Sequence, residues 1–268
     1  MTLYSTSSTW TTQEHNLFSD SVRKFYQDEM VPNVEKWNEK GIVDKEFWLK
    51  AGEAGIMGGS VLEQYGGSGG DMGFDSVALY EQARAGDGSW GYGIQSIVIH
   101  YVSAYGSDEQ KTKWLPKLVS GEKIGALAMT EPGAGSDVQS IKTSAQRDGN
   151  QYSINGSKIF ITNGQSADLV IVTSKTDKNE GAKGVSLIMV DTSEVDGFRR
   201  GKNLKKLGLK GNDTSELFFE NVKVPLTNLI GDEEGQGFYQ LMKQLPWERL
   251  LIGITALGAI DYALKITI

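Results

Sequence analysis

The chain has 268 residues, enough for one large domain or two modest ones, and 39% of them are hydrophobic. Charged residues make up 23% and the net charge is −7, which argues against nucleic-acid or anionic-membrane binding because both need a basic footprint. No run approaches the roughly 18 apolar residues of a membrane span. The first ten residues, MTLYSTSSTW, lack a basic region followed by an apolar stretch. We therefore expect a cytoplasmic protein without a membrane span.

Cysteine is absent and histidine occurs twice, as His15 and His100. Disulfides, thiolate nucleophiles and Cys/His zinc sites are thereby excluded, and we predict no metal site. We expect His15 to lie on the surface of a helix and His100 to pack as an ordinary helical residue. Neither lies near a G-x-S-x-G nucleophile motif. Any chemistry must therefore rest on a carboxylate, a hydroxyl or a cofactor.

Residues 1–125 show the patterns of a helical domain. Capping-box sequences at Thr11-x-x-Glu14 and Ser107-x-x-Gln110 predict two helix starts. Glycine-rich turns separate further predicted helices, at 44–54, 74–85 and 93–105. The one G-x-G-x-x-G match, Gly86 to Gly91, follows a helical pattern rather than a strand, so we do not interpret it as a dinucleotide fingerprint.

Residues 126–235 change to short β-rich runs separated by turn residues. The segment from Tyr152 to Ile161 alternates around Asn155-Gly156, which predicts a type I′ hairpin. Further predicted strands lie at 169–173, 185–190 and 216–219. These runs indicate an all-β middle domain, either a barrel or a sandwich.

Helical periodicity returns over residues 236–268, which we interpret as the start of a further helical domain. This helix would expose an unpartnered apolar stripe. The predicted fold class is therefore α+β and multidomain: an all-α domain, a β domain, and the first helix of a third unit.

The segment from Met129 to Gly164 carries the most specific pattern in the chain. A Thr-Glu-Pro turn leads into Gly133 and Gly135, where the backbone can approach a ligand closely. The segment also supplies hydroxyls and an aromatic face, from Thr130, Ser136, Thr162 and Phe160. On its own chemistry, this pattern is typical either of a flat polar ligand's site or of a plain turn between two strands.

The segment resembles the flavin-binding signature of the acyl-CoA dehydrogenases. The resemblance extends through GSDEQKTKWLPKLVSGE, NLKKLGLKGNDTSELFFENVKVP and LIGDEEGQGFYQLMKQLPWERLL, and so covers residues 15–268. It implies FAD as cofactor and Phe160 over one face of the flavin ring. The cofactor-binding residues that it implies are Leu127, Ala128, Met129, Thr130, Gly135, Ser136, Phe160, Ile161 and Thr162.

The resemblance also implies a catalytic glutamate. Family members remove the α-proton of an acyl-CoA thioester with a glutamate while hydride leaves the β-carbon for the flavin. In the long-chain and isovaleryl branches this glutamate immediately precedes an arginine, as Glu248 precedes Arg249 here, and the long-chain branch is the nearer match. The implied substrate-binding residues are Ser136, Ala182, Lys183, Tyr239, Pro246 and Arg249.

By the same resemblance, the partners are an acyl-CoA and an electron-transfer flavoprotein, and a full-length member forms a tetramer. Such a member carries a C-terminal four-helix domain of roughly 150 residues that helps to hold the flavin. Residues 236–268 match only the first helix of that domain, so we expect this chain to retain flavin poorly and to show little turnover of acyl-CoA. Two alternatives are a flavin oxidase of the same fold and a non-enzymatic acyl-CoA-binding or assembly module.

Overall fold

The computed structural model describes residues 9–268, so most of the first ten residues lie outside the described part of the chain. The first part is helical, and the helices predicted at 44–54, 74–85 and 93–105 are confirmed. A π-helical turn and a 3-10 turn follow the first helix. The helices of this part are α1 (Gln13–Phe25), α2 (Val34–Lys40), α3 (Lys45–Glu53), α4 (Met72–Arg84), α5 (Tyr92–Tyr105) and α6 (Asp108–Val119).

The start of α1 differs from the prediction by one residue. The capping box is formed by Thr12 and His15, not by Thr11 and Glu14, whereas the box predicted at Ser107 is confirmed. The prediction of an exposed His15 is wrong, because its side chain is buried. Its Nδ1 lies 3.1 Å from the backbone N–H of Thr12 and its Nε2 lies 3.0 Å from Asp71 Oδ1. The imidazole thus joins the starts of α1 and α4.

An aromatic cluster forms the centre of the helical part. The Trp90 ring lies between 4.9 and 6.0 Å, centroid to centroid, from the rings of Tyr26, Phe47, Trp48 and Tyr92. Trp90 itself is only 2% exposed. Large aromatic side chains contribute most to core burial, so these rings carry much of the stability of this part. They come from several separate segments and hold the helices together.

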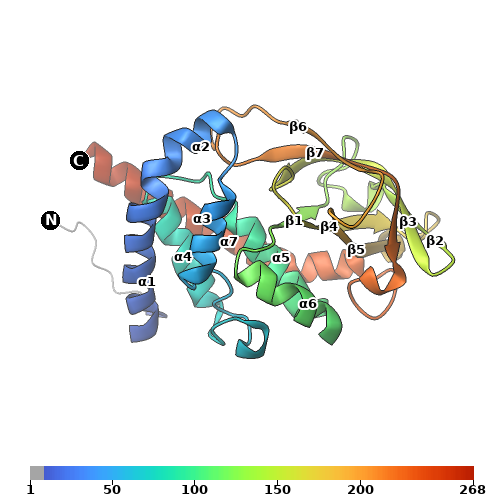
Figure 1. Cartoon of the computed structure of the whole chain (residues 1–268), viewed down its shortest axis with the longest axis horizontal. Coiled ribbons are helices and arrows are strands. Elements are labelled where there is room, and N and C mark those ends of the chain that lie inside the picture. Colours follow the sequence, from blue (N-terminus) through green and yellow to red (C-terminus); the bar gives the residue numbers. More distant parts are fainter. Residues whose placement is uncertain (1–8) are drawn as a thin grey trace.

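The middle part is a seven-stranded mixed sheet, as Figure 1 shows on the side opposite α1. Hydrogen-bonded neighbours follow the order β1-β4-β2-β3-β7-β6, and β5 pairs with β4. β4 and β5 are buried along their whole length. The strands are β1 (Gly125–Ala128), β2 (Ser144–Asp148), β3 (Gln151–Thr162), β4 (Leu169–Lys175), β5 (Val185–Asp191), β6 (Phe198–Asn203) and β7 (Thr214–Pro225).

The hairpin predicted at Asn155-Gly156 is wrong. β3 runs through this pair without turning, and its register with β7 shifts between Ile154 and Gly156. The turn lies earlier, between Asp148 and Gln151, which pair across β2 and β3. Gly156 is instead a place of close approach. A Cβ added there would lie 2.4 Å from Thr143 Oγ1 and 2.7 Å from Thr143 Cα.

A Gly156→Ala substitution should therefore destabilise the sheet. The new methyl group overlaps backbone as well as side-chain atoms of Thr143, so a strand must shift, at a cost of about 1–3 kcal/mol. Urea unfolding measures the change. Gly133→Ala is the control, since a Cβ there would meet no atom within 4 Å. Equal unfolding free energies for the two variants would contradict the prediction.

A long C-terminal helix, α7 (Gly237–Thr267), packs against both parts (Figure 1). At its start Gly237 lies against β5, where a Cβ would come within 2.7 Å of the Ser186 backbone. Towards its end Gly258 lies against α4, where a Cβ would come within 2.4 Å of Tyr80 O. The Tyr80 hydroxyl also donates a hydrogen bond to Asp261. The predicted order of helical domain, β domain and helix is therefore confirmed.

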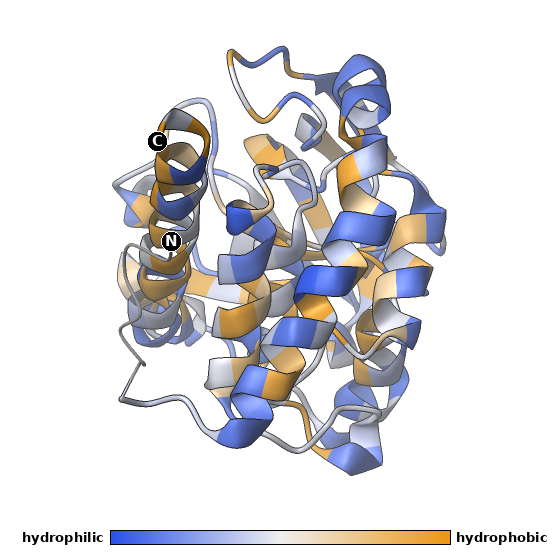
Figure 2. Ribbon diagram, turned by 90° about the vertical axis from the view of Figure 1, so that its left-hand side faces the viewer, coloured by the Kyte–Doolittle hydropathy of each residue, from blue (hydrophilic) through white to orange (hydrophobic). Residues whose placement is uncertain are grey.

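The expectation that no segment has the length of a membrane span needs correction. By length and composition alone, α7 qualifies as a spanning helix, although core helices of other proteins pass the same test. Its C-terminal half is largely exposed, and Figure 2 shows apolar residues along the helix that ends at C. The large exposed hydrophobic side chains of α7 are Tyr239, Met242, Leu250, Ile252, Leu257, Ile260, Leu264 and Ile266.

Candidate active site

The structure places the two segments of the glycine-rich motif side by side. Leu127 and Ala128 end β1, and the chain continues into the loop that contains Met129 and Thr130. The backbone N–H of Ile159 in β3 donates to Thr130 O at 2.9 Å. Residues 127–130 therefore lie next to the end of β3, which residues 160–162 form. This is the arrangement that a shared binding surface requires.

Phe160 has the least usual conformation in this region. Its φ is +60°, and its side chain is 62% exposed. The pairing of β3 with β7 is interrupted between Lys158 and Ile161, and it resumes at Ile161 and Thr162. A non-glycine residue in this conformation costs of order 1–3 kcal/mol and persists only where its surroundings hold it. Such residues cluster at binding sites, so the exposed ring marks a candidate site.

The turn before Ser136 is closed by two backbone hydrogen bonds between Glu131 and Ala134, of 2.9 and 3.1 Å. Gly135 and Ser136 are exposed. A Cβ on Gly133 or Gly135 would meet no atom within 4 Å, and neither residue has a positive φ. Neither packing nor backbone conformation within the chain therefore requires these glycines. Close approach of a ligand's flat ring would explain both, so the residues present fit a flavin.

Glu248 lies on α7, and its half-buried side chain contacts α5. The Tyr101 hydroxyl donates a hydrogen bond of 2.8 Å to Glu248 Oε1. Burial raises the pKa of Glu248, while the Tyr101 hydrogen bond and the charge of Arg249 oppose the shift. Tyr101 was not among the predicted site residues. It lies in an apolar helix 147 positions before its partner, so no local pattern could have identified it.

A Tyr101→Phe substitution should raise the pKa of Glu248 further, because it removes a donor to the charged carboxylate. Carbon-13 NMR of labelled glutamate measures this titration. A carboxyl whose pKa is raised by folding contributes stability below its unfolded pKa and loses that contribution as pH rises through its folded pKa. In the variant, the loss should accordingly extend to higher pH. Tyr105→Phe, on the same helix, is the control and should leave the titration unchanged.

The remaining predicted residues lie around the start of α7 and along it. Ala182 and Lys183 form a 3-10 turn beside this start, where a Cβ on Gly235 would come within 2.3 Å of Lys183 O. Tyr239 is 41% exposed, and Pro246 and Arg249 are exposed on the helix. A small apolar cluster joins this region to the glycine-rich turn. It consists of Ala134, Ile141, Val185 and Phe238.

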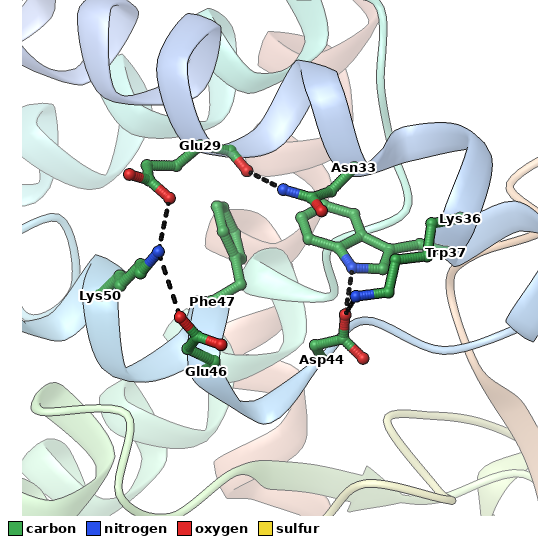
Figure 3. Close-up of a pocket in the computed structure, with 8 residues that line it drawn as sticks. All are labelled: Glu29, Asn33, Lys36, Trp37, Asp44, Glu46, Phe47 and Lys50. Carbon is green, nitrogen blue, oxygen red and sulfur yellow. Dashed lines mark hydrogen bonds and ion pairs between the residues drawn. The ribbon is translucent and has the colours of Figure 1, made fainter.

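Hollows on the described surface include one in the helical part and one at the glycine-rich turn. The first, in the helical part, measures about 120 Å³ and is shown in Figure 3. Its charges are already paired, for example Lys50 with Glu29 at 2.9 Å and with Glu46 at 3.2 Å, so it offers no unpaired charge to a ligand. The second measures about 300 Å³ and lies at the glycine-rich turn. Its lining residues are Glu131, Pro132, Gly133, Ser140, Lys142, Thr143, Gly156 and Ser157.

Comparison with known proteins gives the same family from sequence and from structure. Residues 12–122 match the model of the acyl-CoA dehydrogenase N-terminal domain, and residues 126–222 match that of the middle domain. The long-chain specific acyl-CoA dehydrogenase of Rattus norvegicus mitochondria is 46% identical over 257 residues, which are 95% of this chain and 59% of that protein. This chain therefore spans about three fifths of that relative's length.

Two solved structures extend the match. The acyl-CoA dehydrogenase of Geobacillus kaustophilus superposes with a TM-score of 0.93 at 44% identity, over 97% of this chain and 69% of the other. A glutaryl-CoA dehydrogenase of Mycobacterium smegmatis, solved in complex with FADH2, gives 0.86 at 32% identity, over 95% of this chain and 64% of the other. With two family domains matched in sequence order, the chain belongs to the acyl-CoA dehydrogenase family.

Proposed function

We propose that this chain takes part in the FAD-dependent α,β-dehydrogenation of an acyl-CoA thioester, with Glu248 as the base. The observation that carries the proposal is the position of Glu248 on α7, the helix that packs beside the glycine-rich turn. Its carboxyl is half-buried, and this burial raises its pKa. The α-proton of a thioester is weakly acidic, so the base needs a pKa nearer to the working pH than a solvated glutamate has. Tyr101 orients the carboxylate through its hydrogen bond.

The flavin, when bound, supplies the hydride acceptor. In this proposal Phe160 covers one face of the ring, and the exposed hydroxyl of Ser136 binds at its edge. Ala128 and Ile161 have buried side chains, so they can contribute only backbone groups. The proposed flavin-binding set is Leu127, Ala128, Met129, Thr130, Gly135, Ser136, Phe160, Ile161 and Thr162.

The acyl-CoA would extend from the flavin along the start of α7. The exposure of Tyr239 and the position of the 182–183 turn beside Gly235 support this path. Arg249 is exposed, so its charge can attract the negative charge of CoA. The proposed substrate-binding set is Ser136, Ala182, Lys183, Tyr239, Pro246 and Arg249. We further propose an electron-transfer flavoprotein as electron acceptor, a tetramer for a full-length member, and a cytoplasmic location.

The test is a titration of the 268-residue chain with FAD, followed by anaerobic addition of acyl-CoAs of different lengths. Saturable FAD binding and bleaching of the flavin by an acyl-CoA would support the proposal. Rapid reoxidation in air with peroxide release would favour a flavin oxidase instead. Acyl-CoA binding without FAD binding at any concentration would favour the non-enzymatic module for this chain.

A Gly135→Ala substitution separates flavin contact from folding. Nothing in the chain contacts a Cβ at this position, so the unfolding free energy should change by less than about 0.5 kcal/mol. The methyl group would stand between the backbone and the ring, so the FAD dissociation constant should rise at least about tenfold. Gly208→Ala, where a Cβ is equally unobstructed, is the control. Equal FAD affinities for the two variants would remove Gly135 from the site.

A further inference from the structure

A buried ion pair lies beneath the glycine-rich turn. Lys158 Nζ donates to Glu131 Oε1 at 2.9 Å, and the two side chains are 0% and 7% exposed. The same Nζ donates to Met129 O at 3.0 Å. The Glu131 carboxylate also accepts the backbone N–H groups of Lys142 at 2.6 Å and Thr143 at 2.9 Å. One pair of charges thus connects β3, the turn and the segment that enters β2.

These contacts converge on the proposed flavin-facing surface. Met129, whose carbonyl Lys158 binds, precedes Thr130, whose carbonyl Ile159 binds at 2.9 Å. Lys158 and Ile159 directly precede the strained Phe160. Both flavin-facing segments are therefore attached to Lys158 and Ile159. These residues lie within two positions of Phe160, whose strained backbone conformation most needs support from its surroundings.

The energetics argue that the pair serves position more than stability. Burial lowers the pKa of Lys158 to about 8, even though the charge of Glu131 acts in the opposite direction. Desolvation therefore exceeds the attraction for this lysine, whereas the pKa of Glu131 is lowered, because burial there is outweighed by the charge of Lys158 and the hydrogen bonds to the carboxylate. The two shifts oppose each other in their effect on stability, so the net gain in stability from the pair is small. Buried ion pairs of this kind can often be replaced by apolar residues without loss of stability. A tether with directed hydrogen bonds, however, holds a loop in a way that apolar contacts do not.

We propose that Glu131 and Lys158 form a positioning pair that holds Met129, Thr130 and Phe160 in the geometry that binds the flavin. The flavin part of this proposal rests on the proposed function, whereas the holding of the two segments does not. Neither residue touches the reacting atoms, and both act through the backbone that they fix.

Hydrogen exchange of the 268-residue chain tests the holding directly. The variants are Lys158→Met, Glu131→Gln and the double variant. We expect amides in 129–136 and 159–162 to exchange at least about tenfold faster in all three. The double variant leaves no unpaired buried charge, so its unfolding midpoint should return close to that of the unmodified chain. Its FAD dissociation constant should nevertheless stay at least about tenfold raised.

Lys175→Met is the matched control. Lys175 is also buried in the sheet, but its Nζ donates to Glu180 O at 2.7 Å and Gly181 O at 2.6 Å. Its loss should accelerate exchange around 177–184 and leave 129–136 unchanged.

Three outcomes would overturn the proposal: recovery of slow exchange together with stability in the double variant, faster exchange spread over the whole sheet, or unchanged FAD affinity despite a loosened turn. If the unmodified chain binds no FAD, the proposed function fails, and the exchange pattern alone decides whether the pair holds the turn.

Discussion

Glu248→Gln should abolish most of the reaction while leaving binding intact. Glutamine has nearly the same shape and keeps an acceptor for the Tyr101 hydroxyl, but it cannot remove a proton. General-base contributions are typically 10²–10⁴-fold, so acyl-CoA-dependent flavin reduction should slow by roughly that factor. Anaerobic stopped-flow absorbance, with FAD and acyl-CoA in excess, measures the rate.

Asp261→Asn provides a matched control on the same helix, because this carboxylate also accepts a tyrosine hydroxyl, that of Tyr80. It should leave the reduction rate within about threefold, since surface changes away from a site rarely matter. Retention of the full rate in Glu248→Gln would exclude Glu248 as the base. A large loss of acyl-CoA affinity in this variant would indicate a binding role instead.

Trp90→Ala should cause the largest loss of stability among single core substitutions. The ring contacts four other aromatic rings at 4.9 to 6.0 Å, and the site cannot collapse without moving several helices. Phe/Trp to Ala changes of this kind cost about 3–5 kcal/mol, which is a large share of the stability of an ordinary domain. Guanidinium unfolding followed by circular dichroism measures the change.

Trp10→Ala is the corresponding control, because this tryptophan is 53% exposed and lies at the edge of the helical part. Its removal should cost less than about 1 kcal/mol. A loss for Trp90→Ala no greater than that of the control would show that the aromatic cluster does not hold the helices together.

Local patterns predicted most of the helical part correctly. The helices at α3, α4 and α5 follow from apolar spacing between glycine-rich turns, and Ser107 caps α6 as its spacing with Gln110 indicates. The same method shifted the first cap by one residue. Thr11 and Thr12 are adjacent hydroxyl residues, and the N3 position of the observed box is held by His15, whereas the pattern expects Glu or Gln there.

The Asn155-Gly156 error has a different physical origin. An Asn-Gly pair favours a tight turn locally, but a twelve-residue strand with partners on both sides gains more from continuing. The need for glycine at 156 comes from the approach of Thr143, thirteen positions earlier. Likewise, the pairing of Tyr101 with Glu248 joins segments that only the folded chain brings together. The candidate site was therefore located by motif, while its supporting contacts required the structure.

The position of Glu248 on a helix anchored at both ends has a mechanical consequence. α7 packs against β5 at its start and against α4 near its end. The Glu248 carboxylate therefore lies on a helix that connects the β part with the helical part. Pro246 lies two residues before Glu248 and removes one backbone hydrogen bond from α7. The helix is therefore expected to bend most easily at this residue. A movement of the sheet relative to the helical part would therefore move the Glu248 carboxylate, so the alignment of the proposed base depends on how the two parts are packed together.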